Sequence, residues 1–90
     1  MFITIRGKRW KYRETHATTY YGECDPPDAK GKEIRIARRL KGQRRLETLV
    51  HEMLHAAGWH WDEEFVDEVA RDIARELWKL GYRRQGEEDG

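Results

Sequence analysis

One change of spacing constrains the fold more than any other feature of this sequence. Apolar residues recur at every second position in several segments before Gly42, and at every third or fourth position after it. The first spacing is typical of half-buried strands and the second of amphipathic helices. Because the strand-like segments precede the helical ones, the sequence predicts an α+β fold, with a short twisted antiparallel or mixed sheet packed on two helices.

The first half of the chain contains four strand-like runs. The first two flank Gly7, which offers a turn, and they are predicted to form a hairpin. Residues 22–31 are rich in glycine, proline and charged residues, and this composition predicts an exposed loop. Strands are predicted at residues 2–6, 10–13, 18–21 and 32–37.

The second half contains two helical patterns. The first is predicted to end at Gly58, and the second to begin after Asp62 as the N-cap and to end at Gly81. Residues 1–82 are therefore predicted to form a single domain, followed by a polar, frayed tail at residues 83–90. The apolar stripes are Leu46, Leu49, Val50, Met53 and Ala57 on the first helix, and Val66, Val69, Ala70, Ile73, Leu77 and Leu80 on the second.

Composition limits the class of protein. Ninety residues make one small domain, and 39% of them are charged, although the formal net charge is only +1. Cys24 is the only cysteine, so an intrachain disulfide is excluded and a reducing compartment is favoured. No apolar run approaches the roughly 20 residues of a membrane span. These features predict a soluble, cytoplasmic protein.

A five-residue motif within the first helical pattern carries the strongest chemical signal. His51-Glu52-Met53-Leu54-His55 is HExxH, and residues four apart stack on one face of a helix. Both imidazoles can then bind one zinc ion, and Glu52, about 100° further round the helix, can act as a general base on a water molecule there. The motif predicts a zinc-dependent hydrolase that acts on a peptide or protein substrate.

A third protein ligand is expected, because catalytic zinc sites commonly use three. The metzincin pattern is excluded, since Trp61 stands where that pattern has a histidine. The acidic start of the second helix is a better source, and Glu63 is favoured because it flanks the apolar stripe next to the connection. The alternatives are Glu64, Asp67, Glu68 and His60.

The order of elements around this motif resembles known metallopeptidases. A strand with Glu33-Ile34-Arg35-Ile36, followed by a helix with Leu49-Val50-His51-Glu52-Met53-Leu54-His55-Ala56, is similar to the minimal zincin cores of SprT-like and ImmA/IrrE-like enzymes and to small phage-encoded proteins with HExLHA. The resemblance implies a zincin fold with one zinc ion, His51 and His55 as ligands and Glu52 as the base. It implies a glutamate ligand from the following helix, and a substrate strand that pairs with residues 32–37.

Two other functions remain open from the sequence. The metal could be structural or regulatory with little turnover, because a short chain gains stability from a bound ion. Alternatively, the chain could be a module that binds nucleic acid or protein without metal, through the basic cluster at Arg38, Arg39, Lys41, Arg44 and Arg45. This cluster is interpreted as a solvated connector. Trp59 and Trp61 could cover the core or line a substrate pocket, and the oligomeric state is not predicted.

Overall fold

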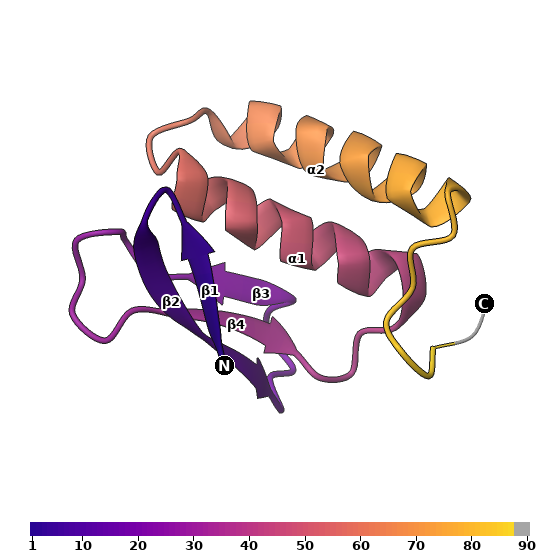
Figure 1. Cartoon of the computed structure of the whole chain (residues 1–90), viewed down its shortest axis with the longest axis horizontal. Helices are drawn as coiled ribbons and strands as arrows, with labels where there is room; N and C mark the ends of the chain where they lie inside the picture. Colours follow the sequence, from indigo (N-terminus) through magenta and orange to yellow (C-terminus); the bar gives the residue numbers. More distant parts are fainter. Residues whose placement is uncertain (88–90) are drawn as a thin grey trace.

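The computed structural model describes residues 1–87. Its four strands form one mixed sheet in the order β1-β2-β4-β3. α1 packs on one face of this sheet, and α2 packs on the far side of α1, which is its only contact among the described elements (Figure 1). The predicted α+β class is confirmed. The elements are β1 (Phe2–Ile5), β2 (Lys8–Thr15), β3 (Gly22–Cys24), β4 (Glu33–Ala37), α1 (Gly42–Ala57) and α2 (Glu63–Lys79).

β1 and β2 form an antiparallel hairpin in which Ile5 pairs with Lys8. The two residues between them, Arg6 and Gly7, have positive φ angles of 52° and 79°. A two-residue turn of this kind follows the right-handed twist of the strands that it joins, and glycine adopts positive φ without strain. The hairpin predicted around Gly7 is therefore confirmed.

The edge of the sheet next to β4 is occupied by β3, which pairs with β4 antiparallel, whereas β2 pairs with β4 in parallel. The strand predicted at residues 18–21 is wrong. Those residues carry the chain from the end of β2 past β4, and the Tyr20 hydroxyl hydrogen-bonds Thr15 Oγ1 at 2.9 Å. β3 forms instead within residues 22–31, the segment predicted to be a loop, and Tyr21 just before it accepts a hydrogen bond of 2.7 Å from the Ala37 backbone N–H at the end of β4.

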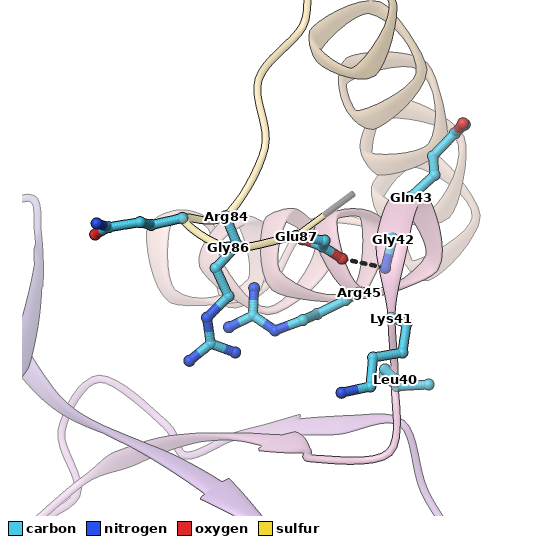
Figure 2. Close-up of a pocket in the computed structure, with 9 residues that line it drawn as sticks. Leu40, Lys41, Gly42, Gln43, Arg45, Arg84, Gly86 and Glu87 are labelled. Atoms are coloured by element: carbon cyan, nitrogen blue, oxygen red, sulfur yellow. Dashed lines mark hydrogen bonds between the residues drawn. The ribbon is translucent and has the colours of Figure 1, made fainter. Parts of the chain in front are cut away.

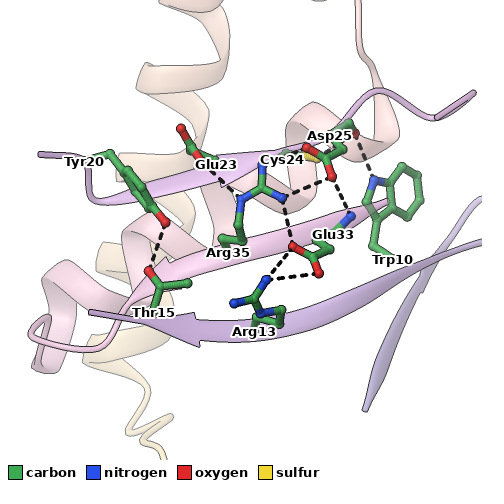
Figure 3. A network of polar contacts seen from close by, with 9 residues as sticks. All are labelled: Trp10, Arg13, Thr15, Tyr20, Glu23, Cys24, Asp25, Glu33 and Arg35. Atoms are coloured by element: carbon green, nitrogen blue, oxygen red, sulfur yellow. Dashed lines mark hydrogen bonds and ion pairs between the residues drawn. The ribbon is translucent and has the colours of Figure 1, made fainter. Parts of the chain in front are cut away.

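A network of charged side chains ties β3 to β4 on the face of the sheet away from α1 (Figure 3). Arg35 Nη2 lies 2.7 Å from Asp25 Oδ1, and Arg35 also pairs with Glu23 and Glu33, at 3.1 Å in each case. Hydrogen bonds from Arg35 lower the pKa of Asp25 and of Glu33. Arg13 adds a second cation, 3.1 Å from Glu33. The short edge strand is thus held by side chains as well as by its backbone.

The main hydrophobic core lies between the sheet and α1. Its largest side chain is Trp10, which is fully buried and donates a hydrogen bond of 3.0 Å from Nε1 to the carbonyl oxygen of Asp25. Leu49 and Met53 of α1 pack against this core. Its buried members are Trp10, Ile34, Ile36, Ala37, Leu40 and Ala56.

The boundaries predicted for both helices agree with the structure. α1 ends just before Gly58, and the Asp62 side chain caps α2 by accepting a hydrogen bond of 3.2 Å from the Phe65 backbone N–H. The apolar stripe predicted for α2 is only partly right, because Ile73 and Leu80 are 38% and 73% exposed. The face of α2 that meets α1 is set by small side chains one turn apart, and Ile73 and Leu80 lie beside that face. The buried residues of α2 are Val66, Ala70 and Ala74.

The segment after α2 turns back toward the start of α1. The sequence predicts a frayed tail at residues 83–90, and in the described part of it Arg84 lies 2.8 Å from Glu14. The Glu87 carboxylate accepts a hydrogen bond from the backbone N–H of Gly42 (Figure 2). Residues 88–90 lie outside the described residues. Neither α1 nor α2 is long and apolar enough to cross a membrane.

Candidate metal centre

α1 presents the two motif histidines side by side on successive turns. The Nε2 atoms of His51 and His55 are 3.0 Å apart, and both side chains are partly exposed, at 21% and 16%. The rings meet edge to face, with centroids 4.6 Å apart. Neither histidine belongs to the hydrophobic core, so both rings are accessible to an ion from the solvent side.

The first turn of α2 brings Glu63 to this pair. Glu63 Oε1 lies 3.2 Å from His51 Nε2, and Glu63 Oε2 lies 3.3 Å from His55 Nε2. The connection between the helices is short, and it turns tightly through a hydrogen bond of 2.9 Å from the Trp61 backbone N–H to the Gly58 carbonyl oxygen. The three ligand atoms lie within 4.8 Å of one another, and within residues 1–87 no other group of this kind is found.

The size and chemistry of this group fit zinc. Zinc ligands in tetrahedral sites lie about 2.0–2.1 Å from the ion, so neighbouring ligand atoms are roughly 3.3 Å apart. The two Nε2 atoms here are 3.0 Å apart, and each has a different Glu63 oxygen near it, at 3.2 and 3.3 Å; with one oxygen per carboxylate, the three ligand atoms lie within 4.8 Å of one another. Two imidazoles and one carboxylate are also a ligand set found in catalytic zinc sites, which leave one position for water or substrate.

Asp67, one turn after Glu63, contacts the same histidine from the other side. Its Oδ1 lies 3.2 Å from His51 Nδ1. A carboxylate at this distance can accept a proton from Nδ1, and the Nε2 lone pair of His51 would then be free to face Glu63 and His55. The sequence suggested Asp67 only as a substitute for Glu63 in the ligand set. Glu64, Glu68 and His60, which were candidates for the same ligand position, lie outside the group.

Glu52 points toward the edge strand and away from solvent. Glu52 is only 7% exposed, and it lines the same cavity as His51, His55 and Glu63. The pKa of Glu52 is raised to about 7, first by burial and then by the negative charges of Glu63 and Glu23. A carboxylate in such surroundings is suited to accepting and returning a proton near neutral pH.

Gly22 of β3 makes room for Glu52. A Cβ atom at Gly22 would lie 3.1 Å from Glu52 Oε2 and 2.8 Å from the Thr48 methyl group, closer than side chains normally pack. The edge strand can therefore approach α1 only because this residue lacks a side chain. No local pattern indicated this role, since Gly22 belongs to a segment whose composition predicts a loop.

The structure keeps Cys24 out of the metal group. Burial, followed by the charges of Glu52 and Asp25, raises the pKa of Cys24 to about 12. Its Sγ donates to the carbonyl oxygen of Asp25 at 3.5 Å. Cys24 does not belong to the group of ligand atoms formed by His51, His55 and Glu63.

Comparison with known proteins adds nothing to this geometry. No family model, curated sequence or solved structure matches the chain. The residues of the site are therefore the basis for any assignment of function.

The basic cluster before and within α1 is largely engaged with the chain's own groups. Arg45 lies 2.7 Å from the Tyr12 hydroxyl and 3.2 Å from Glu14. Arg39 donates to two backbone carbonyl oxygens, and both Arg39 and Arg44 lie over the Tyr21 ring. These contacts favour a role in joining the sheet to α1 over a continuous phosphate-binding surface.

Proposed function

We propose that this chain is a zinc-dependent peptidase, in which His51, His55 and Glu63 hold the ion and Glu52 is the general base. The observation that carries the proposal is the triangle of ligand atoms on α1 and α2, with the Glu52 carboxylate beside it. When bound at such a triangle, zinc supplies positive charge that acidifies water and polarises a carbonyl group.

Each residue then has a distinct task. Asp67 fixes the ring of His51 by holding its Nδ1 proton, and Glu63 supplies a negative charge that offsets part of the charge of the ion. Glu52 takes a proton from the attacking water on its carboxylate and delivers it to the nitrogen of the leaving amine. Because Glu52 is largely buried, little bulk water competes for this proton.

The edge strand supports a peptide as the substrate. The resemblance implied that a substrate strand would pair with residues 32–37, but β4 is flanked on both sides, by β2 and β3. That expectation is wrong, and β3 is the strand with a free edge beside Glu52. The backbone hydrogen bonds of Tyr21 and Asp25 point to β4, so those of Gly22 and Cys24 point to the free edge. An extended peptide can add to this edge through its backbone.

A structural metal is the second candidate, and one observation favours it. α2 contacts only α1 among the described elements, so an ion shared by His51, His55 and Glu63 would join α2 to the rest of the domain. Metal binding of this kind contributes folding energy without turnover.

The test combines metal analysis with one conservative substitution. We expect about one zinc ion per chain and cleavage within a broad peptide library. Glu52→Gln retains size but cannot accept the proton, so zinc content and folding should stay near wild type while hydrolysis falls roughly 100-fold or more. Glu64→Gln, on the exposed side of α2, is the matched control and should cleave like wild type.

Each outcome separates the candidates. Zinc content without cleavage would favour the structural metal. Protein that neither contains zinc nor takes it up on titration would exclude both metal functions and leave a binding module. Full activity of Glu52→Gln would remove Glu52 as the base.

A further inference from the structure

A second cavity opens at the end of α1, next to the metal centre. Ala56, Ala57 and Ile5 contribute its apolar floor, and it is closed on one side by Pro27 of the loop after β3 and on the other by Trp59 and Trp61. Arg6, Lys8, Asp28 and His60 also line it, whereas His51, His55, Glu63 and Glu52 do not. The cavity is therefore distinct from the ligand group, and its lining combines apolar and aromatic side chains with polar ones.

The aromatic residues of the connection between α1 and α2 are exposed instead of covering the core. Trp59 is 36% exposed and Trp61 47%, and Phe65 in the first turn of α2 is 51% exposed. Exposed aromatic groups of this size commonly mark a binding site, because leaving them in water is unfavourable. Their exposure decides between the two roles that the sequence left open for Trp59 and Trp61.

One wall of this cavity is built by close contacts. The Trp61 ring lies so near Gly58 that a Cβ atom there would come within 2.1 Å of it. On its other side the ring meets Phe65 edge to face, with centroids 5.9 Å apart. Trp61 is thus held in place before any ligand arrives, which reduces the entropy lost on binding.

Trp59 connects this cavity to the metal centre. It lines both cavities, and its ring centroid lies 6.3 Å from that of His55. β3 runs from Gly22 toward Cys24, and the chain continues from there to Pro27 at the cavity wall. A peptide paired with the free edge of β3 therefore passes Glu52 and then reaches the cavity.

We propose that this cavity binds a bulky apolar side chain, aromatic or branched aliphatic, on the N-terminal side of the bond that is cleaved. The side follows from the direction of pairing. Antiparallel pairing, which β3 already makes with β4, is slightly more stable per residue than parallel pairing, and it places the N-terminal part of the peptide at the Cys24 end of β3. The inference rests on the proposed peptidase function and names its substrate class. A single apolar side chain in such a pocket gives roughly 10-fold or greater discrimination over glycine.

The test compares two peptides that differ only at that position, leucine or phenylalanine in one and glycine in the other. Binding is measured with zinc-loaded Glu52→Gln, and cleavage with wild type. We expect the apolar peptide to be favoured roughly 10-fold in both assays. Trp61→Ala should remove most of this preference while zinc content stays near wild type, and Trp61→Phe should restore part of the preference.

Phe2→Ala is the matched control, because Phe2 is an exposed aromatic residue at the start of β1 that does not line the cavity. The Phe2→Ala variant should prefer the apolar peptide over the glycine peptide as strongly as wild type does. Equal binding of the two peptides, a preference that survives Trp61→Ala, or a preference on the C-terminal side only would overturn the inference. If wild type cleaves neither peptide but the binding preference depends on Trp61, the pocket stands and the peptidase function fails.

Discussion

His51 is the most constrained side chain of the candidate site. Its Nε2 atom faces His55 and Glu63, whereas its Nδ1 atom faces Asp67. Both carboxylates come from the same helix, one turn apart, so the position of α2 sets the orientation of the imidazole. The two acids nevertheless have different expected roles, because Glu63 reaches both histidines and Asp67 contacts His51 from its far side.

Alanine substitutions of Glu63 and Asp67 should show which of the two contributes more to zinc affinity. Asp67→Ala removes an orienting contact, and changes of this type cost about 10–100-fold in metal affinity. We expect Glu63→Ala to weaken zinc binding by more than Asp67→Ala, because it removes a direct ligand. Competition titration with a fluorescent chelator measures both affinities.

Glu64→Ala is the control for this series, since its side chain lies outside the group and a loss of no more than about twofold is expected. If Asp67→Ala or Glu64→Ala lost more affinity than Glu63→Ala, the assignment of the third ligand would be wrong although the two histidines could still bind metal.

Spacing along the sequence accounts for the part of the site that could be predicted. His51, Glu52 and His55 follow from helical periodicity alone, and Glu63 followed from its place beside an apolar stripe; its ligand role stays a prediction. The role of Asp67 required the distance to one ring nitrogen. Gly22 could not be found at all, because its importance comes from an approach between β3 and α1 that no local pattern records.

Among the strands, β3 has the fewest residues, and its Gly22 packs against Glu52 of the candidate site. Three residues pair it with β4, and Arg35 adds ion pairs to Glu23 and to Asp25, just after the strand. The paired residues of β4 lie 10 to 14 positions further along the chain. Sequence patterns detect alternation within a strand, and three residues are too few to show it.

Low pH should therefore weaken the attachment of β3 to β4. The pKa of Asp25 and of Glu33 is lowered in the folded state. The stability that these groups contribute is therefore fully present above their pKa values in the unfolded chain, about 3.9 for Asp and 4.3 for Glu. It is lost as the pH falls through the lower folded values. We expect the urea midpoint to drop from about pH 5 downward, with Arg35→Met lowering it at pH 7 and flattening its dependence on pH.

Arg75→Met provides the comparison, because the ion pairs of Arg75 within residues 1–87 are with exposed acids of α2. It should keep the wild-type dependence on pH below 5. A dependence in Arg35→Met as steep as in wild type would show that the acid sensitivity arises elsewhere.

The longer elements were easier to predict. Both helices carry their own periodicity and end signals, and the hairpin carries its own turn at Gly7. The face of α2 was predicted less well. Ala70 and Ala74 set the contact with α1, and a stripe chosen by hydrophobicity gave equal weight to Ile73 and Leu80, which lie beside that contact.

At the scale of the whole molecule, the layers are stacked in series. The sheet contacts α1, and α1 contacts α2 (Figure 1). The candidate ligands span only the second of these two interfaces. A bound ion would consequently strengthen the interface between α1 and α2, which has smaller buried side chains than the interface between α1 and the sheet.

Metal removal should lower the melting temperature. At a free zinc concentration 100 times Kd, binding stabilises the folded state by about 2.7 kcal/mol. For a domain of this size that corresponds to roughly 10–20 °C in Tm. Differential scanning calorimetry before and after chelation, and again after zinc is restored, measures the shift.

The Glu63→Ala variant should show a smaller shift under the same treatment, because it binds the ion less tightly. An unchanged Tm in wild-type protein that has demonstrably released its zinc would mean that the ion does not hold α2 to α1.

α1 meets a different neighbour on each side: the sheet, α2, and the open side with its two histidines. Few of its positions can vary freely over evolution, because a substitution in α1 alters its packing on the sheet, its contact with α2 or the candidate metal site. The connections at residues 26–32 and 59–61 carry none of the candidate ligands, and both border the cavity beside the candidate metal centre. A lineage built on this scaffold could retarget its substrate by exchanging these two loops while α1 drifted very little.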